Sequence, residues 1–552
     1  MHPSRRRARP LLTLVLGGLV AGAAYSPVLA RRTESPVPKN PDDRTIVHVL
    51  NRIGYGPTPG DVERIRTTGL EAYIEQQLHP EKIDDAAMRA RLEALTTIHA
   101  SSRELAEQYF MPAQRARAAQ QRVRASTQSG TSQEPEMMAP APAPEIRGER
   151  QVLVQLSEQK LLRAAYSDRQ LEEVMVDFWF NHFNVFAAKG PTRNYVTEYE
   201  RAAIRPHVLG KFRDLLQATA ESPAMLFYLD NWQSAAPQAQ EQAPMRGRQR
   251  RGARVNDPRT LANAAPAAQN RRPRGINENY ARELMELHTL GVDGGYTQKD
   301  VQEVARAFTG WTIANPRQGG DFVFEPRMHD AGVKTVLGTR INAGGKADGE
   351  QVLDLLAKHP STARHIATKL ARRFVSDDPP AALVDRAAKR FRDSGGNIRE
   401  VLRTILISPE FFAPEAQRAK IKNPFEFVIS SVRATAVTMP SAAPLVQSLR
   451  ELGMPVYFCQ PPTGYADKAE AWVNTGALLN RMNFAVALTE GRLRGMRGSG
   501  TLRAARVQPA DLLIKDIFAG DLSATTAATV RKAETPAQTI ALLLGSPEFQ
   551  RK

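Results

Sequence analysis

The sequence contains a single cysteine, Cys459, among its 552 residues. One thiol cannot form an intrachain disulfide, and it excludes a zinc site built from several thiolates. The chain also lacks a glycine-rich phosphate-binding loop, a nucleophile elbow and a CxxC motif. The enzyme classes that these motifs identify are therefore excluded, and any chemistry must come from residues far apart in the sequence.

No apolar run after residue 30 reaches transmembrane length, but the first 30 residues are typical of an export signal. Four arginines precede residue 10, residues 11–24 are uncharged and mostly apolar, and residues 28–30 offer a small-residue cleavage site. The apolar run is shorter than the roughly 20 residues that span a bilayer. We predict a signal peptide over residues 1–30 and a mature protein, without a transmembrane segment, that is periplasmic or extracellular. A retained anchor is the alternative.

The charge of the chain is unbalanced, with 75 Lys and Arg against 58 Asp and Glu. Nine arginines and two acids lie between residues 233 and 274, in a stretch rich in Ala, Gln and Pro. Such a stretch cannot bury enough apolar surface to fold alone. We predict disordered insertions over residues 112–146 and 233–275. Export and the scarcity of aromatic residues argue against nucleic-acid binding, and weak contact with anionic envelope polymers or phospholipid is the alternative to a solvated loop without a partner.

Helical spacing of apolar residues dominates the rest of the chain and predicts a mainly α fold, a multi-helix globular body. Asn277 is placed to cap a helix that runs to Gly291, and Thr297 with Asp300 forms a capping box for the next helix. The predicted parts after the signal peptide are a linker (31–44), an N-terminal helical part (45–111), a helical core (147–232), motif-bearing helices plus a hairpin (276–345) and a C-terminal helical part (346–552).

Strand signals are short. Phe322 and Phe324 alternate with polar neighbours, and residues 330–332 offer a turn before residues 333–337. We predict one small β-hairpin near residues 322–338.

Several motifs occur in an order that is typical of one protein family. They are DFWFNHF (177–183), NENYARELMELHTLG (277–291), YTQKDV (296–301), ARAFTGW (305–311) and WVNT (472–475). From about His48 to the last residue, and apart from the two insertions, the chain resembles the large bacterial family called domain of unknown function 1800. The resemblance implies an exported helical protein without a settled activity, often encoded near a sulfatase-like protein family. Gly464-Tyr465 departs from the Gly-Trp that is usual in the family.

The segment around the first motif is the most unusual. It is aromatic nearly all round, except for a narrow polar stripe formed by Asp177, Asn181 and Asn184. A helix this aromatic is expected to be buried, so the stripe should face a polar seam or a cavity. The stripe either fixes helix packing through hydrogen bonds or forms one wall of an active site, with Asp177 or His182 as the general base.

Two further histidines are candidates. His288 falls in the apolar arc of its helix, about 140° from Glu283, so these two residues cannot bind one ion from this helix alone. A buried, hydrogen-bonded His288 is the structural interpretation. His329, beside Asp330 on a predicted turn, would be a solvent-reachable acid, base or ligand.

A site that holds a divalent metal is possible if four side chains converge in the fold: His182, Glu283, His288 and His329. The same residues together with Asp177 would suffice for acid–base catalysis. Glu286 could take the place of Glu283 in either site. Two hypotheses follow. The first is a non-catalytic envelope scaffold or partner of a secreted sulfatase-like protein. The second is an exported hydrolase-like enzyme that acts on an envelope or extracellular polymer through a histidine–carboxylate site.

Overall fold

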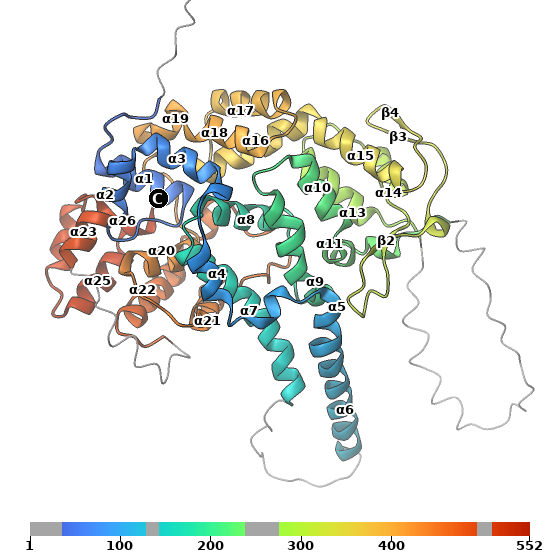
Figure 1. Cartoon of the computed structure of the whole chain (residues 1–552), viewed down its shortest axis with the longest axis horizontal. Coiled ribbons are helices and arrows are strands. Elements are labelled where there is room, and N and C mark those ends of the chain that lie inside the picture. Colours follow the sequence, from blue (N-terminus) through green and yellow to red (C-terminus); the bar gives the residue numbers. More distant parts are fainter. Residues whose placement is uncertain (1–35, 129–142, 238–274, 494–509) are drawn as a thin grey trace, which may run out of the picture. The chain divides into compact units, whose positions relative to one another are not determined.

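The computed structural model describes residues 36–128, 143–237, 275–493 and 510–552, and these residues are mainly α-helical (Figure 1). The predicted mainly α fold is confirmed. The predicted signal peptide lies outside the described residues, as do residues 31–35 of the predicted linker. No helix in the described ranges is both long and apolar enough to cross a bilayer.

The N-terminal part begins with helix α1 (Asp43–Ile53), followed by α2 (Asp61–Thr68), α3 (Leu70–Leu78) and α4 (Ala86–Leu92). The Asp42 carboxylate accepts a hydrogen bond from the backbone N–H of Thr45 and so caps α1. One face of α1, with Ile46, Val49 and Ile53, is fully buried.

The first predicted insertion is partly wrong. After α5 (Ser102–Leu105) and a π-helical turn (Ala106–Phe110), helix α6 (Met111–Gln128) occupies the first half of the segment and packs against α7 (Pro144–Tyr166). The Ala, Arg and Gln residues that suggested disorder are also strong helix formers, and contact with α7 supplies the burial that an isolated helix lacks, as at Ala113. Residues 129–142 lie outside the described part.

Helix α8 (Gln170–His182) lies in the core and contacts α1, α3 and α7. Phe178, Trp179 and Phe180 are all buried, as the aromatic composition predicts. The Trp179 indole N–H donates to the Val208 carbonyl at 3.1 Å, so the buried ring leaves no unsatisfied donor. Helices α9 (Thr192–Glu198), α10 (Phe212–Glu221) and α11 (Pro223–Tyr228) follow.

The two ends of the second insertion are part of the fold, while residues 238–274 lie outside the described ranges. The Ala235 N–H donates to the Gly275 carbonyl at 3.2 Å, and the Ala236 N–H donates to the Met328 carbonyl at 2.8 Å. Both alanines are buried. The folded part therefore extends a few residues further into the predicted insertion than its composition suggests.

Both predicted caps in the motif region are confirmed. Asn277 caps α13 (Glu278–Glu283), and Thr297 with Asp300 forms the capping box of α14 (Gln298–Ala307). Between them, α13 continues as a π-helical turn (Leu284–Thr289), which rotates His288 relative to a regular helix.

The predicted hairpin contains the right strands with the wrong pairing. Strand β1 (Trp311–Ile313) pairs with β2 (Phe322–Phe324), and β3 (Lys334–Val336) pairs with β4 (Thr339–Ile341), both antiparallel. The tight turn lies at Leu337-Gly338, where both residues have positive φ, as a two-residue hairpin turn requires. Asp330, which suggested the turn, instead binds Arg306.

Twelve helices form the C-terminal part of the described chain, and every residue of α20 is buried. Asn423 and Glu426 form its capping box. The helices are α15 (Lys346–Lys358), α16 (Pro360–Phe374), α17 (Ala381–Asp393), α18 (Ile398–Leu406), α19 (Pro409–Phe412), α20 (Pro424–Thr435), α21 (Ala443–Glu451), α22 (Thr475–Thr489), α23 (Ala510–Phe518), α24 (Ala524–Val530), α25 (Pro536–Gly545) and α26 (Pro547–Gln550).

Candidate binding site

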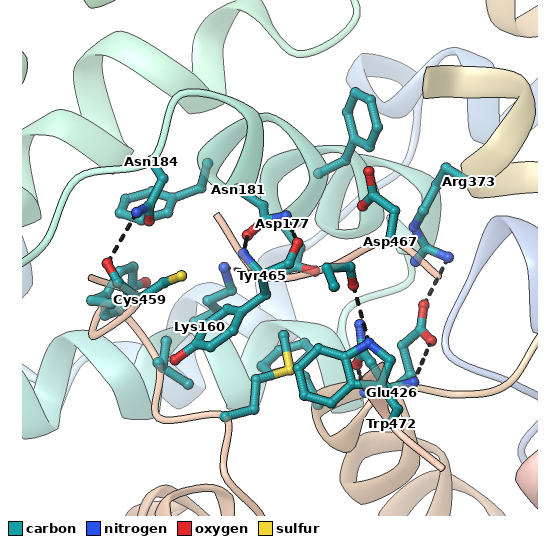
Figure 2. Close-up of a pocket in the computed structure, with 18 of the residues that line it drawn as sticks. Lys160, Asp177, Asn181, Asn184, Arg373, Glu426, Cys459, Tyr465, Asp467 and Trp472 are labelled. Carbon is teal, nitrogen blue, oxygen red and sulfur yellow. Dashed lines mark hydrogen bonds and ion pairs between the residues drawn. The ribbon is translucent and has the colours of Figure 1, made fainter. Parts of the chain in front are cut away.

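The polar stripe of α8 faces a pocket, as the sequence predicts. Asp177, Asn181 and Asn184 all line it, together with residues of α7, α16, the start of α20 and the segment 454–472 (Figure 2). We call this pocket the α8 pocket. Other lining residues that the argument uses are Lys160, Lys369, Arg373, Lys420, Glu426, Cys459, Tyr465, Asp467 and Trp472.

The two asparagines hold the segment 459–465 against the end of α8. The Asn181 side-chain amide donates to the Tyr465 carbonyl at 2.9 Å and accepts from the Tyr465 N–H at 2.7 Å (Figure 2). The Asn184 amide donates to the carbonyls of Cys459 and Pro461 at 3.0 and 2.8 Å. These side chains satisfy backbone groups that would otherwise be buried without partners.

A glycine makes this approach possible. Gly464 has a φ of +73°, and a Cβ atom there would lie 2.3 Å from the backbone oxygen of Asn181. Only glycine fits a position that combines positive φ with so close a backbone neighbour. The segment that contains Gly464-Tyr465 therefore packs closely against α8.

The charged residues of the pocket are paired across helices. Lys160 of α7 lies 2.8 Å from Asp177 of α8, and both side chains are mostly buried. The Lys160 ammonium also lies within 5.6 Å of the ring centroids of Phe180, Phe425 and Tyr457.

On the other side of the pocket, the Glu426 carboxylate forms an ion pair with Arg373 of α16 at 2.7 Å and also pairs with Lys552. Burial alone would raise the pKa of Glu426, but these two cations hold it well below its ordinary value. Asp467 lies 3.6 Å from Lys369, and Lys420 pairs with Asp377. Every acidic side chain that lines the α8 pocket therefore has a cationic partner.

Cys459 lines the same pocket, but its thiol is not activated. Burial raises the pKa of Cys459 to about 11. The thiol is therefore protonated at neutral pH and is a poor nucleophile.

The structure brings two of the predicted histidines together. The rings of His182 and His288 lie 6.2 Å apart, with His365 of α16 6.1 Å from His182. His182 Nε2–H donates to the His288 carbonyl at 3.1 Å. Burial, helped by the nearby Lys369, lowers the pKa of His288 to about 3 and that of His365 to about 4, and it lowers the pKa of His182 strongly. The three imidazoles are therefore neutral at physiological pH.

Glu283 has no described contact with these histidines. It is half-buried, and burial together with Glu286 raises its pKa above the ordinary value. Glu286 accepts a hydrogen bond from the Tyr296 hydroxyl at 3.1 Å. The structure thus separates this carboxylate pair from the imidazoles that the sequence joined with it.

His329 is not solvent-reachable, which corrects the prediction. Its side chain is 4% exposed; Nδ1–H donates to the Thr309 carbonyl at 2.8 Å, and Nε2 lies 3.2 Å from Asp348. Fully buried Lys334 also binds Asp348, at 2.6 Å. Because Asp348 belongs to α15 and Lys334 to β3, this network joins the second hairpin to the helix that follows it.

The predicted metal site is not assembled. Across residues 36–128, 143–237, 275–493 and 510–552, no group of three or more His, Cys, Asp or Glu side chains lies close enough to hold a metal ion. His182 and His288 lie together, whereas Glu283 and His329 take part in other networks.

The sequence did not indicate the charged partners in the pocket. Lys160, Arg373 and Glu426 come from three helices, and only Glu426 has apolar residues on both sides in the sequence. The signal that could have found them is a charged residue within an otherwise apolar helix face, because such a residue needs an opposite charge nearby.

The fold and the pocket define a class: a mainly α-helical protein with a polar pocket whose walls are joined by buried ion pairs and amide contacts. A family model described as "Protein of unknown function (DUF1800)" matches residues 48–551, and the chain belongs to that family. The comparisons with curated proteins and with solved structures found no match.

Proposed function

We propose that this chain is an exported, non-catalytic scaffold of the cell envelope and a partner of a secreted sulfatase-like protein. One observation carries the proposal. The polar stripe of α8, which the sequence offered as an active-site wall, is engaged in fixed contacts: Asp177 with Lys160, and Asn181 and Asn184 with backbone carbonyls. These contacts make the pocket a pre-formed surface, which suits binding.

The aromatic part of the pocket supplies the contact area. Tyr465 and Trp472 are part-exposed and their ring centroids lie 6.1 Å apart. The Trp472 indole N–H already donates to the Ala466 carbonyl at 3.0 Å, so the ring face is what remains for a partner. Tryptophan and tyrosine in such positions commonly dominate binding energy.

Co-purification tests the partnership. The full chain is expressed together with an affinity-tagged, secreted sulfatase-like protein from the same bacterium. We expect the two to elute together, and we expect Trp472→Ala to reduce the amount of this chain that is recovered at least about tenfold, the effect of losing a hot-spot aromatic residue. Val473→Ala, at the exposed neighbouring position, is the matched control. No co-elution with the unaltered chain would contradict the partnership.

Export is tested independently by mass spectrometry of the purified chain and by cell fractionation. We expect a mature protein that begins after residue 30 and is recovered outside the cytoplasm. A chain that retains residues 1–30 and sediments with membranes would support the anchored alternative instead.

A hydrolase remains the second candidate because of Glu283. A half-buried carboxyl group whose pKa is raised beside a second carboxylate, Glu286, is a common arrangement for a general acid. If the chain degrades an envelope or extracellular polymer, Glu283→Gln should abolish the release of reducing ends, and Glu278→Gln, one turn earlier, should not. Equal rates in both variants would exclude Glu283 as the acid.

A further inference from the structure

A second pocket lies between α1, the segment 414–422, α23 and α26. The three helices lie in the same region of Figure 1. It shares no lining residue with the α8 pocket. Lys422, His48, Asn51, Arg44 and Arg418 line it. We call it the Lys422 pocket.

Lys422 is buried without an acidic partner. The residue is 3% exposed, and its backbone N–H donates to the Gln550 carbonyl at 2.9 Å. The ammonium lies 3.9 Å from the centroid of the Phe549 ring, and it makes no hydrogen bond or ion pair with the described residues. An ammonium carries three N–H donors, and a single ring face cannot satisfy them.

The pKa of Lys422 agrees with this geometry. Burial lowers the pKa of Lys422 to about 7, because the attraction of Glu426 does not offset burial and the repulsion from Arg481 and Arg418. The amine therefore gains most from a negative charge brought into the pocket.

Two buried hydrogen-bond acceptors of α1 lack a donor. His48 Nε2–H donates to the Phe411 carbonyl at 2.9 Å, which leaves Nδ1 as an acceptor with no donor. The Asn51 amide donates to the Val47 carbonyl at 2.9 Å, and its Oδ1 is also buried without a donor. Unsatisfied buried polar atoms are rare in proteins, and each calls for a ligand or a water molecule.

Cations surround the entrance. Arg44 and Arg418 both bind the single carboxylate of Asp521, at 2.6 and 3.0 Å. Glu548, the other acid of the lining, is occupied by the backbone N–H of Ser523 and the Thr526 hydroxyl, both at 2.9 Å. The walls therefore present more positive than negative charge to a ligand.

We propose that the Lys422 pocket binds a small ligand that carries an oxyanion next to a hydroxyl or amine group, with Lys422 holding the oxyanion and His48 or Asn51 accepting from the donor group. A phosphate monoester of a polyol has this chemistry. Such a group could be a free metabolite or the end of an envelope polymer, and the two sources share the same recognition.

Isothermal titration calorimetry of the full chain tests the proposal with three probes. Glycerol 3-phosphate carries both groups, inorganic phosphate only the oxyanion, and glycerol only the hydroxyls. We expect glycerol 3-phosphate to bind at least tenfold more tightly than inorganic phosphate, and glycerol not to bind. No binding of either phosphate at a ligand concentration of about 10 mM would overturn the proposal, because a Kd weaker than this does not define a specific site.

Lys422→Met keeps the length of the side chain and removes its charge. We expect it to weaken glycerol 3-phosphate binding at least about tenfold, as the loss of a charged hydrogen bond does. Lys389→Met, at an exposed lysine of α17, is the matched control and should bind like the unaltered chain. Equal affinities in the unaltered chain and Lys422→Met would overturn the assignment.

If Lys422→Met does not fold, Arg44→Gln at the exposed rim of the pocket is the alternative test. We expect it to lower the affinity for glycerol 3-phosphate about threefold, because it weakens the positive potential of the pocket. Unchanged binding in that variant would overturn the proposal. The two sources of the ligand are then separated by comparing glycerol 3-phosphate with a poly(glycerol phosphate) chain. A preference for the small molecule indicates a metabolite, and a preference for the polymer indicates a chain end.

Discussion

The α8 pocket and the Lys422 pocket both contain buried charges, but the charges are paired in the first pocket and unpaired in the second. In the α8 pocket, Asp177 and Glu426 have cationic partners on other helices. In the Lys422 pocket, the buried cation has an aromatic face and no acid. In a paired buried charge the attraction between the partners offsets much of the cost of desolvation, and removing one partner leaves the other uncompensated. An unpaired buried charge costs free energy in the folded protein as it stands, so it is better explained by something that binds there.

The largest expected effect is on the pH dependence of stability, because three neutral histidines lie beside the α8 pocket. The unfolded chain binds protons at these residues below pH about 6.5, whereas folded His288 and His365 bind them only near pH 3 and 4. Their contribution is therefore complete above pH 6.5 and is lost as the pH falls toward 4. Between pH 7 and 5 we expect the free energy of unfolding to fall by about 2 kcal/mol for each of these histidines, and by about 6 kcal/mol for the three together.

Urea unfolding at pH 7 and pH 5 measures this fall. His288→Gln should reduce it by about 2 kcal/mol, while the substitution of exposed His99 by Gln should leave it unchanged. If the free energy of unfolding falls equally between pH 7 and 5 in the His288→Gln and His99→Gln variants, His288 is protonated in the folded protein and its burial does not keep it neutral.

The next largest effect tests the pairing itself. Glu426→Gln removes one charge and leaves Arg373 and Lys552 buried without a carboxylate. We expect the free energy of unfolding to fall by about 3–5 kcal/mol. Asp393→Asn, which breaks the exposed pair with Lys389, is the control and should cause no measurable change. A loss below 1 kcal/mol for Glu426→Gln would mean that these ion pairs do not organise the pocket.

A smaller effect isolates the contact between α8 and the segment 459–465. Gly464→Ala introduces a Cβ atom 2.3 Å from the Asn181 backbone oxygen, at a positive φ. Gly453 has a similar φ of +82°, but a Cβ there meets nothing within 4 Å. Gly453→Ala should cost about 1 kcal/mol for its backbone conformation alone, and Gly464→Ala about 2 kcal/mol more because of the clash. Equal losses would contradict the close fit.

The sequence predicted this part of the molecule well where the signal was local. The aromatic helix with its polar stripe was predicted to be buried and to face a cavity, since the helical period places Asp177 and Asn181 on one side. Asn184 also lines the pocket, although it follows the end of the helix. The caps at Asn277 and Thr297 depend on residues three positions apart at most, and both are confirmed. What the stripe binds could not be predicted, because Tyr465 lies 284 residues from Asn181.

Local signals also misled where the true partner was distant. The sequence joined His329 to the adjacent Asp330 as an exposed pair, but its ring instead lies beside Asp348 on α15. The strand at 322–324 pairs with the preceding strand β1 rather than with β3, and Asp330 binds Arg306. Period and composition fix which face of an element is buried, but not which distant residues it meets.

The smallest expected change in stability comes from the other pocket and completes the comparison. Lys422→Met replaces a buried ammonium that has no acid with an apolar side chain of similar length. Because no partner is left unpaired, we expect the free energy of unfolding to stay the same or to rise by up to about 2 kcal/mol, measured in urea at pH 7 without phosphate. The same variant is expected to lose the phosphate ligand. A loss of several kcal/mol would show that the Phe549 ring or an ordered water compensates the charge, and the contrast between the two pockets would then disappear.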